Sequence, residues 1–188
     1  MTIPYKKIPL SFDVKRLTAD AHRFTGSDWE PHFNIHYYEG DWSVVPLRAA
    51  KGANTDIFPD PAAGEGYYET LQMSLCEYIP ELLHCFKCDL QTVRFMKLAA
   101  GAQIKRHRDY ILGLEDGFVR IHIPVTTNPD VEFILNDESV NMLPGEAWYM
   151  NVNFHHSVIN GGGTDRIHLV VDCVVNEWMR EMIEAQAA

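Results

Sequence analysis

The sequence predicts a mainly β protein of the jelly-roll type, with helices packed against its strands. From Leu90 onward, apolar and polar residues alternate with period two in short runs that Gly, Pro, Asn and Asp separate. Spacing of this kind favours an antiparallel sandwich or barrel over a parallel α/β sheet. Eight such runs are expected to be strands, at residues 90–98, 103–109, 118–125, 131–135, 139–143, 146–151, 156–160 and 166–175.

The chain of 188 residues is long enough for one domain with a substantial core, and no repeat or linker divides it. We therefore expect a single domain, 1–188. Within it, residues 1–89 supply N-terminal strands and supporting helices, 90–175 form the jelly-roll core, and 176–188 carry a last helix, at about 176–186.

The N-terminal half begins with a predicted strand at residues 8–12. Asp13 can cap a helix that runs to about Phe24. Apolar residues at helical spacing support this prediction, and they are Val14, Leu17 and Ala21.

Two further β-like runs follow, at residues 32–38 and 42–47. The stretch 49–66 is rich in Gly, Pro, Ala and Asp and predicts a long loop, of the length that often acts as a lid. Residues 67–86 carry the strongest helical pattern of the chain, with a break expected at Pro80.

Composition excludes several classes of function. The net charge is −10, which would repel a phosphate backbone, so we expect no nucleic-acid partner. No apolar run reaches the roughly eighteen residues that a membrane span requires, so no membrane segment is expected. The first residues lack the apolar core of a secretory signal, which favours a cytoplasmic protein. An anionic small substrate would need specific arginines to hold it.

Four cysteines are present, and Cys85 and Cys88 form a CxxC pair beside His84. A structural zinc site usually needs a second pair, and a thioredoxin-like motif needs a βαβ context. Neither is found, so we expect reduced thiols near the end of a helix, with zinc or redox chemistry as the alternative.

The stretch at residues 105–114 contains His107-Arg108-Asp109, which also begins the catalytic loop of protein kinases. A kinase needs an Asn five residues after that Asp, and Leu114 stands there instead. The glycine-rich loop and the strand lysine of a kinase are missing too. The kinase interpretation therefore fails.

A metal site is the better interpretation of the same residues. On a strand, His107 and Asp109 would point to one face, and the 2-His-1-carboxylate triad of non-haem Fe(II) oxygenases needs this pair plus one histidine from elsewhere. Alternatively, His107 is a surface histidine near two arginines. Of the adjacent His155 and His156, alternation allows only one to face a metal, and we favour His156.

Glycines 161–163 predict a hairpin between 156–160 and 166–172, which would bring His156 close to Arg166. An arginine beside a metal site suits a co-substrate that chelates the metal at one end and carries a carboxylate at the other, because a guanidinium binds a carboxylate through two hydrogen bonds. The alternative is a surface arginine paired with Asp165 or Glu177.

Two strands open with the same three residues, Arg120-Ile-His122 and Arg166-Ile-His168. In each, the Arg and the His share a strand face. They could be outward-facing polar residues of unrelated strands. If they face the interior, the buried charge requires an anionic occupant.

These motifs together resemble the aspartyl/asparaginyl β-hydroxylase-like 2-oxoglutarate-dependent dioxygenases, which include bacterial free-amino-acid hydroxylases such as proline hydroxylases. The resemblance covers most of the chain from Gly40 to Asp172. The matching stretches are GDWSVVPLRAAKG (40–52), RFMKLAAGAQIKRHRD (94–109), RIHIPV (120–125), GEAWYMN (145–151) and HSVINGGGTDRIHLVVD (156–172).

The resemblance implies a double-stranded β-helix, also called a cupin-like jelly roll, with Fe(II) bound by His107, Asp109 and His156. It also implies residues that bind the co-substrate or the substrate. Arg166 would pair with the distal carboxylate of 2-oxoglutarate, Arg120 and His122 would bind a carboxylate of co-substrate or substrate, and Trp42 would lie near the co-substrate.

The expected activity is that of an Fe(II)- and 2-oxoglutarate-dependent dioxygenase. It would use O₂ to hydroxylate a small molecule, a free or carrier-bound amino acid, and would release succinate and CO₂. Two alternatives remain, a hydroxylase of Asp or Asn residues in a protein partner, and a non-enzymatic jelly-roll binding module. The substrate and the oligomeric state are not predicted.

Overall fold

The computed structural model describes residues 2–51, 57 and 66–185, and within them it places two antiparallel sheets face to face. The strands are β1 (Tyr5–Ser11), β2 (Glu30–Pro31), β3 (Tyr38–Glu39), β4 (Trp42–Ala50), β5 (Tyr67–Glu69), β6 (Leu90–Leu98), β7 (Gln103–His107), β8 (Phe118–Thr126), β9 (Val131–Leu135), β10 (Glu138–Ser139), β11 (Glu146–Met150), β12 (His156–Asn160) and β13 (Arg166–Val174). The larger sheet has the order β1-β11-β8-β13-β6-β4-β2, with β5 paired to β4. The smaller sheet has the order β10-β9-β12-β7-β3. The predicted jelly roll is therefore confirmed.

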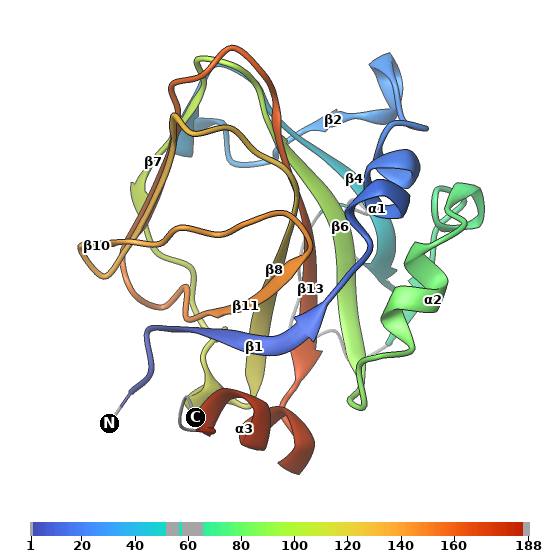
Figure 1. Ribbon diagram of the computed structural model, residues 1–188, viewed down its shortest axis with the longest axis vertical. Helices are drawn as coiled ribbons and strands as arrows, with labels where there is room; N and C mark the ends of the chain where they lie inside the picture. The colour runs from blue at the N-terminus through green and yellow to red at the C-terminus, as the bar shows by residue number, and fades with distance from the viewer. Residues whose placement is uncertain (1, 52–56, 58–65, 186–188) are drawn as a thin grey trace.

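Helices lie outside the sandwich (Figure 1). The α-helices are α1 (Val14–Ala21), α2 (Ile79–Leu83) and α3 (Glu177–Glu184), and one-turn 3₁₀ helices lie at Gly26–Asp28, Ile35–Tyr37, Met73–Leu75 and Leu114–Asp116. In Figure 1, α1 and α2 flank β4 and β6, while α3 lies below β1 near the ends of β8 and β13. None of the helices in the described ranges has the length and apolarity that crossing a bilayer requires.

The larger sheet is covered on both faces, so alternate residues of its strands enter two separate cores. Along β13, Leu169 and Val171 join the core beneath the helices, whereas Val170 joins the core between the sheets. Burial on both faces makes long strands nearly continuous in buried residues, as β8 and β13 are. Polar residues on the inner face are therefore buried between the sheets, and along β13 they are Arg166, His168 and Asp172.

The first strand and helix lie close to the predicted ranges, although β1 already begins at Tyr5, α1 ends at Ala21 and not near Phe24, and Val14 is 39% exposed. The Asp13 carboxylate accepts a hydrogen bond from the backbone N–H of Arg16 at 3.0 Å, which caps α1. Leu17 and Ala21 are buried on the inner side of the helix.

The prediction of a β-like run at 32–38 was wrong. Residues 35–37 form a 3₁₀ turn, and only Tyr38 joins a strand within that range. The backbone N–H of His32 is bound to Trp42 O at 2.8 Å, so the chain turns back beside the start of β4. Ile35 is 65% exposed, and aromatic and β-branched residues favour strands only where a pleated surface buries them.

The helix predicted over 67–86 was also largely wrong, because β5, a 3₁₀ turn and the short α2 occupy this stretch. Pro80 lies in the first turn of α2 instead of breaking a helix. A tertiary contact determines where α2 begins. The buried carboxylate of Asp20, on α1, accepts hydrogen bonds from the backbone N–H groups of Glu77, Tyr78 and Ile79 at 2.7–2.9 Å.

Two predicted strands are shorter than expected. Of residues 139–143 only Ser139 is in a strand, because the chain then leaves the sheet to bury Val140 and Met142 between the sheets. The strand predicted at 103–109 ends at His107, so Asp109 follows β7 instead of lying on it.

The predicted hairpin between 156–160 and 166–172 was wrong. β12 pairs with β7 and β9 in the smaller sheet, whereas β13 pairs with β6 and β8 in the larger one. The glycines at 161–163 therefore connect the two sheets. The side-chain amide of Asn160 donates hydrogen bonds to Leu98 O and Ala99 O at 3.0 and 3.1 Å, which ties the end of β12 to the end of β6. Most of the loop predicted at 49–66, with its proposed role as a lid, lies outside the described residues.

Candidate active site

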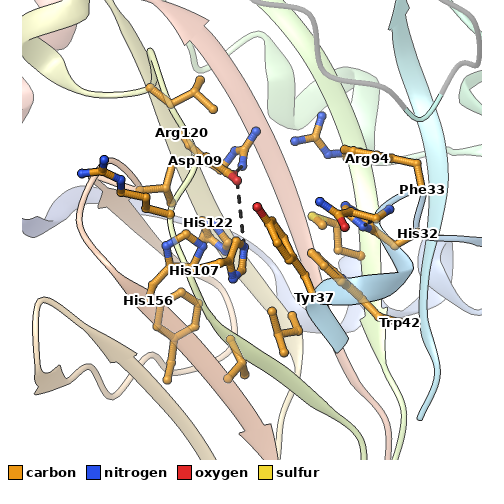
Figure 2. A pocket seen from close by; sticks show the side chains of 18 of the residues that line it. His32, Phe33, Tyr37, Trp42, Arg94, His107, Asp109, Arg120, His122 and His156 are labelled. Atoms are coloured by element: carbon orange, nitrogen blue, oxygen red, sulfur yellow. Dashed lines mark hydrogen bonds and ion pairs between the residues drawn. The ribbon is translucent and has the colours of Figure 1, made fainter. Parts of the chain in front are cut away.

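A cavity of about 340 Å³ lies between the two sheets (Figure 2). Side chains from β4, β6, β8 and β13 line it on one side, and side chains from β7, β9 and β12 line it on the other. The sequence predicted seven site residues, and all seven line this cavity. They are Trp42, His107, Asp109, Arg120, His122, His156 and Arg166.

His107 and His156 face each other across β7 and β12. The two residues are register partners, and their ring centroids lie 4.3 Å apart. Each Nδ1 lies near the backbone carbonyl of the residue two positions earlier in the chain, Lys105 O at 2.7 Å and Phe154 O at 3.1 Å. A hydrogen bond of this kind keeps the proton on Nδ1, so each Nε2 is free as a metal ligand. Burial lowers the pKa of His156 to about 4, so its ring is neutral at pH 7.

Asp109 lies just beyond the end of β7. Its backbone N–H donates to Val152 O at 2.9 Å, which holds the residue beside the histidines although the strand has ended. Its Oδ1 lies 3.9 Å from Nε2 of His107, and its Oδ2 accepts a hydrogen bond from Nη1 of Arg120 at 2.6 Å. Burial alone would raise the pKa of Asp109, but Arg120 and the two histidines lower it below its ordinary value.

The three side chains have the donor types that an Fe(II) site requires, two imidazoles and one carboxylate. Among the described residues, no three His, Cys, Asp or Glu side chains lie close enough together to hold a metal ion as they stand. Within the three candidate ligands, Oδ2 of Asp109 is bound to Arg120, and its Oδ1 lies 3.9 Å from Nε2 of His107. The chemistry of the donor set therefore fits the metal.

Arg120 belongs to a buried network on the inner face of the larger sheet. Its Nε and Nη2 donate to Oδ1 and Oδ2 of Asp172 at 2.7 and 3.1 Å. Oδ2 of Asp172 also accepts hydrogen bonds from Thr92 at 2.7 Å and from Arg94 at 3.2 Å. Although burial alone would raise it, the pKa of Asp172 is held well below its ordinary value by these two arginines.

Arg166 lies at the other end of the same strand face. It precedes Asp172 by six positions, which corresponds to about 20 Å along a strand. Its side chain is buried, with 2% of the residue exposed, and its Nε has no hydrogen-bond partner among the described residues. Nη2 lies 2.9 Å from Nδ1 of His168, and the guanidinium carbon lies 5.7 Å from the centre of the Phe133 ring. Neither neighbour carries a negative charge.

Burial lowers the pKa of Arg166 to about 9, and no carboxylate in the described part of the chain forms an ion pair with it. The surface pairing with Asp165 or Glu177 that the sequence left open is therefore not found. A buried cation without an anion is costly, so this position is suited to an anionic ligand.

Two more cavity-lining residues carry unsatisfied polar atoms. Nε2 of His122 and Nε1 of Trp42 are buried without a hydrogen-bond partner among the described residues. Nδ1 of His122 lies 3.3 Å from Nδ1 of His168, which already faces Arg166. Buried polar groups are nearly always hydrogen-bonded, so these atoms indicate further ligand contacts.

The sequence predicted that His168 shares a strand face with Arg166 but gave it no role in the site, and Arg94 and Asp172 were not singled out. Alternation could have found Asp172, because every second residue after Arg166 shares its strand face. Arg94 could have been found in the same way from β6, once the inner face of that strand was known.

His32 and Tyr37 were missed because their segment was assigned to a strand. The His32 ring stacks on Trp42 with centroids 3.5 Å apart, and burial lowers the pKa of His32 to about 3. The centroid of the Tyr37 ring lies 4.6 Å from that of His107. Figure 2 shows the Tyr37 hydroxyl directed toward Asp109. These rings form the wall of the cavity next to the candidate metal ligands.

Comparison with solved structures supports the fold. An oxidoreductase of the 2OG-Fe(II) oxygenase family from Burkholderia pseudomallei superposes with a TM-score of 0.63 at 16% identity, over 93% of this chain and 88% of that one. A prolyl-4-hydroxylase from Pseudomonas putida superposes with a TM-score of 0.56 at 12% identity, over 92% and 93% of the two chains. At these identities the likeness concerns the fold alone.

Curated relatives include two L-proline hydroxylases. The chain is 26% identical over 165 residues to an L-proline cis-4-hydroxylase from Rhizobium meliloti (strain 1021), which covers 87% of this chain and 58% of the relative. It is 25% identical over 167 residues to an L-proline cis-3-hydroxylase from a Streptomyces species, over 87% of this chain and 57% of the relative. The chain thus spans little more than half the length of these relatives.

A family model matches most of the sequence. The model describes aspartyl/asparaginyl β-hydroxylases, and it matches residues 12–175. This range contains all seven predicted site residues and the strands that carry them. The chain therefore belongs to the aspartyl/asparaginyl β-hydroxylase family.

Proposed function

We propose that this protein is an Fe(II)- and 2-oxoglutarate-dependent dioxygenase that hydroxylates a free amino acid. One observation carries the proposal. A buried arginine that has no anionic partner among the described residues, Arg166, lines the same cavity as the His107, Asp109 and His156 donor set. A dicarboxylate such as 2-oxoglutarate can chelate a metal at one end and bind an arginine at the other. It therefore needs a metal site and a free arginine in one cavity.

His107, Asp109 and His156 would hold Fe(II), which when bound supplies the activation of O₂ that is coupled to conversion of 2-oxoglutarate to succinate and CO₂. Arg166 would bind the distal carboxylate of 2-oxoglutarate and so orient its 2-oxo acid end toward the metal ligands. His122 and Trp42 line the cavity, and each has a buried ring nitrogen without a partner in the described part of the chain, so they would complete the contacts to the co-substrate.

Arg120 has a different role in this proposal from the one that the resemblance implied. Its guanidinium is engaged by Asp172 and Asp109, so we assign it to the positioning of the Asp109 carboxylate.

The substrate would lie on the side of the cavity that Arg94, His32 and Tyr37 line. Arg94 provides positive charge for a substrate carboxylate. It donates only one hydrogen bond to Asp172, from Nη2 to Oδ2 at 3.2 Å. The stacked rings of His32 and Trp42 provide an apolar wall for a side chain. The protein's contribution to the reaction is to hold the reacting C–H bond near the metal and to exclude water.

A free amino acid suits the size of this cavity, because about 340 Å³ lies near the lower end of the range for small-molecule sites. The names of the two proline hydroxylases support the same class of substrate. The alternative, hydroxylation of Asp or Asn residues in a protein partner, is supported by the description of the family model.

Succinate release tests the proposal. The purified protein is incubated with Fe(II), ascorbate and 2-oxoglutarate, together with each proteinogenic amino acid in turn, beginning with proline. We expect one amino acid to stimulate succinate formation and to acquire one oxygen atom by mass spectrometry. Stimulation only by an Asp- or Asn-containing peptide would favour the alternative. The absence of succinate with every free amino acid and peptide would favour a non-enzymatic binding module and contradict the proposal.

A further inference from the structure

We propose that Asp172 is a positioning residue for the metal site, which acts on the metal ligand Asp109 through Arg120. The inference rests on the proposed function, because it assumes that Asp109 binds the metal. Asp172 does not line the cavity and is 1% exposed, so it cannot contact a ligand there itself. Its effect must pass through the residues that it holds.

The cross-strand register places Asp172 directly beside Arg120. The two residues are partners on β13 and β8, and both side chains lie on the inner face of the sheet. Nε of Arg120 donates to Oδ1 of Asp172 at 2.7 Å, and Nη2 donates to Oδ2 at 3.1 Å. A guanidinium that is bound to a carboxylate through two parallel hydrogen bonds has a fixed plane and direction.

This fixed fork leaves Nη1 as the nitrogen of Arg120 that faces the metal ligands. Nη1 donates to Oδ2 of Asp109 at 2.6 Å, while Oδ1 of Asp109 lies on the His107 side at 3.9 Å from Nε2. Arg120 therefore binds Asp109 through one oxygen. The other oxygen is left to face the histidines, where a metal would need it.

An Arg120 that Asp172 did not hold could turn and bind both oxygens of Asp109. Two hydrogen bonds between guanidinium and carboxylate would then compete with the metal for the same oxygens. Loss of the Asp172 charge would also weaken metal binding. Asp172 also binds Arg94, so without it two buried arginines would lie near the metal ligands with Asp109 as their nearest anion. Both effects predict weaker metal binding when the charge of Asp172 is removed.

The alternative is that Asp172 affects the metal site only through its charge, without positioning Arg120. The two roles differ in their dependence on Arg120. A positioning role requires Arg120, whereas the direct electrostatic effect of a carboxylate on a cation does not.

Metal affinity in a double-mutant cycle separates these roles without any substrate. Co(II) affinity is measured for the wild-type protein, Asp172→Asn, Arg120→Met and the double variant, by competition with a chelator. The visible absorption of bound Co(II) reports its coordination. We expect Asp172→Asn to weaken Co(II) binding by about 10- to 100-fold, the usual effect of losing a partner of a metal ligand. We also expect the spectrum to change. In the Arg120→Met background the same substitution should change the affinity less than about twofold, because independent effects are additive and this one depends on Arg120.

A buried carboxylate with two arginine partners can be needed for folding, so a second comparison is included. Arg94→Gln with Asp172→Asn removes one buried cation together with the anion, and it is compared with Arg94→Gln alone. Asp172→Asn is expected to weaken Co(II) binding by the same factor in the Arg94→Gln protein as in the wild-type protein. Each variant is accepted only if its circular dichroism matches that of the wild-type protein.

Two results would overturn the inference. One is a folded Asp172→Asn or Arg94→Gln/Asp172→Asn protein that binds Co(II) as tightly as its reference and with the same spectrum. The other is an equal loss of affinity with and without Arg120. A wild-type protein that binds no Co(II) would instead contradict the proposed function, on which the inference depends.

Discussion

Nη1 of Arg120 lies 2.6 Å from Oδ2 of Asp109, and the rest of the same guanidinium is bound to Asp172. The candidate metal ligand that follows the end of β7 is therefore attached to the larger sheet as well as to the smaller one. Asp109 is positioned by two contacts from outside β7, its backbone N–H on Val152 and its carboxylate on Arg120. The candidate metal site thus depends on the packing of the two sheets.

Replacing His107, Asp109 or His156 by alanine should abolish turnover, because each substitution removes one of three protein ligands. Fe(II) or Co(II) affinity should fall by at least about 100-fold, the upper end of the effect of losing an outer partner of a ligand. Anaerobic titration with a competing chelator measures this. Lys105→Ala is the control, since this residue precedes His107 on β7 and its side chain forms an exposed ion pair with Glu39. Full activity in any one of the three alanine variants would remove that residue from the site.

Between the adjacent histidines, only His156 should matter. His156 is buried and faces His107, whereas His155 is exposed. His155→Ala should therefore keep metal affinity and turnover, while His156→Ala should lose both. Parallel measurements of the two variants decide the assignment. Loss of metal binding in the His155 variant would reverse it.

Arg166→Ala should raise the apparent KM for 2-oxoglutarate. Loss of one partner of a desolvated charge pair typically costs about 2–5 kcal/mol, which corresponds to about thirty-fold or more at 1.4 kcal/mol per tenfold. Co(II) affinity without co-substrate should change little, because no metal ligand is removed. Arg106→Ala, which breaks an exposed ion pair with Asp137, is the matched control. An unchanged KM in the Arg166 variant would refute the assignment.

The stability of the metal-free protein should fall when the pH falls below about 6.5, the ordinary pKa of histidine. Burial lowers the pKa of His32 to about 3 and of His156 to about 4, and it holds the pKa values of His122 and His168 well below 6.5. Below pH 6.5 the unfolded chain therefore binds protons that the folded protein does not, so stability decreases as the pH decreases. Each such histidine contributes up to about 1.4 kcal/mol per pH unit.

Urea unfolding at pH 7.5 and pH 5.0, with a chelator present, measures this dependence. The difference should amount to several kcal/mol, at roughly 2 kcal/mol for each histidine over this window. His32→Phe keeps an aromatic ring against Trp42 and should reduce the pH dependence by about one proton. Equal stability at the two pH values would contradict the burial of neutral histidines in the cavity.

The strands of the C-terminal half could be predicted because alternation in their sequences reflects burial on the two faces of a sheet. Their partners could not. The glycines at 161–163 suggested a hairpin, yet β12 and β13 belong to different sheets. A connection between sheets and a hairpin need the same flexible residues, and only long-range pairing separates the two.

The stretch 67–86 shows a second limit. Its apolar spacing is helical, but α2 begins only at Ile79. There the backbone N–H donates a hydrogen bond to the carboxylate of Asp20, which lies on α1, far away in the sequence. A helix boundary that a tertiary hydrogen bond sets has no local signal.

The structure brings together the residues that were predicted for one site, while their roles stay a prediction. His107, Asp109, His156 and Arg166 were predicted from residue type, spacing and resemblance, although the hairpin that was expected to join the last two does not exist. These residues meet because both inner faces line one cavity. The partners that act through other residues, such as Asp172, have no motif of their own and became visible only through their hydrogen bonds.

The central claim is that His107, Asp109, His156 and Arg166 form one site for Fe(II) and 2-oxoglutarate. Anaerobic titration of the Fe(II)-loaded protein with 2-oxoglutarate tests it most directly, because chelation of Fe(II) by a 2-oxo acid produces a visible absorption band and needs no substrate. The account predicts that 2-oxoglutarate produces the band and that succinate, which lacks the 2-oxo group, does not. The band should be missing in His156→Ala and should require about thirty-fold or more co-substrate in Arg166→Ala. A wild-type protein that binds Fe(II) and shows no band at saturating 2-oxoglutarate would contradict the account.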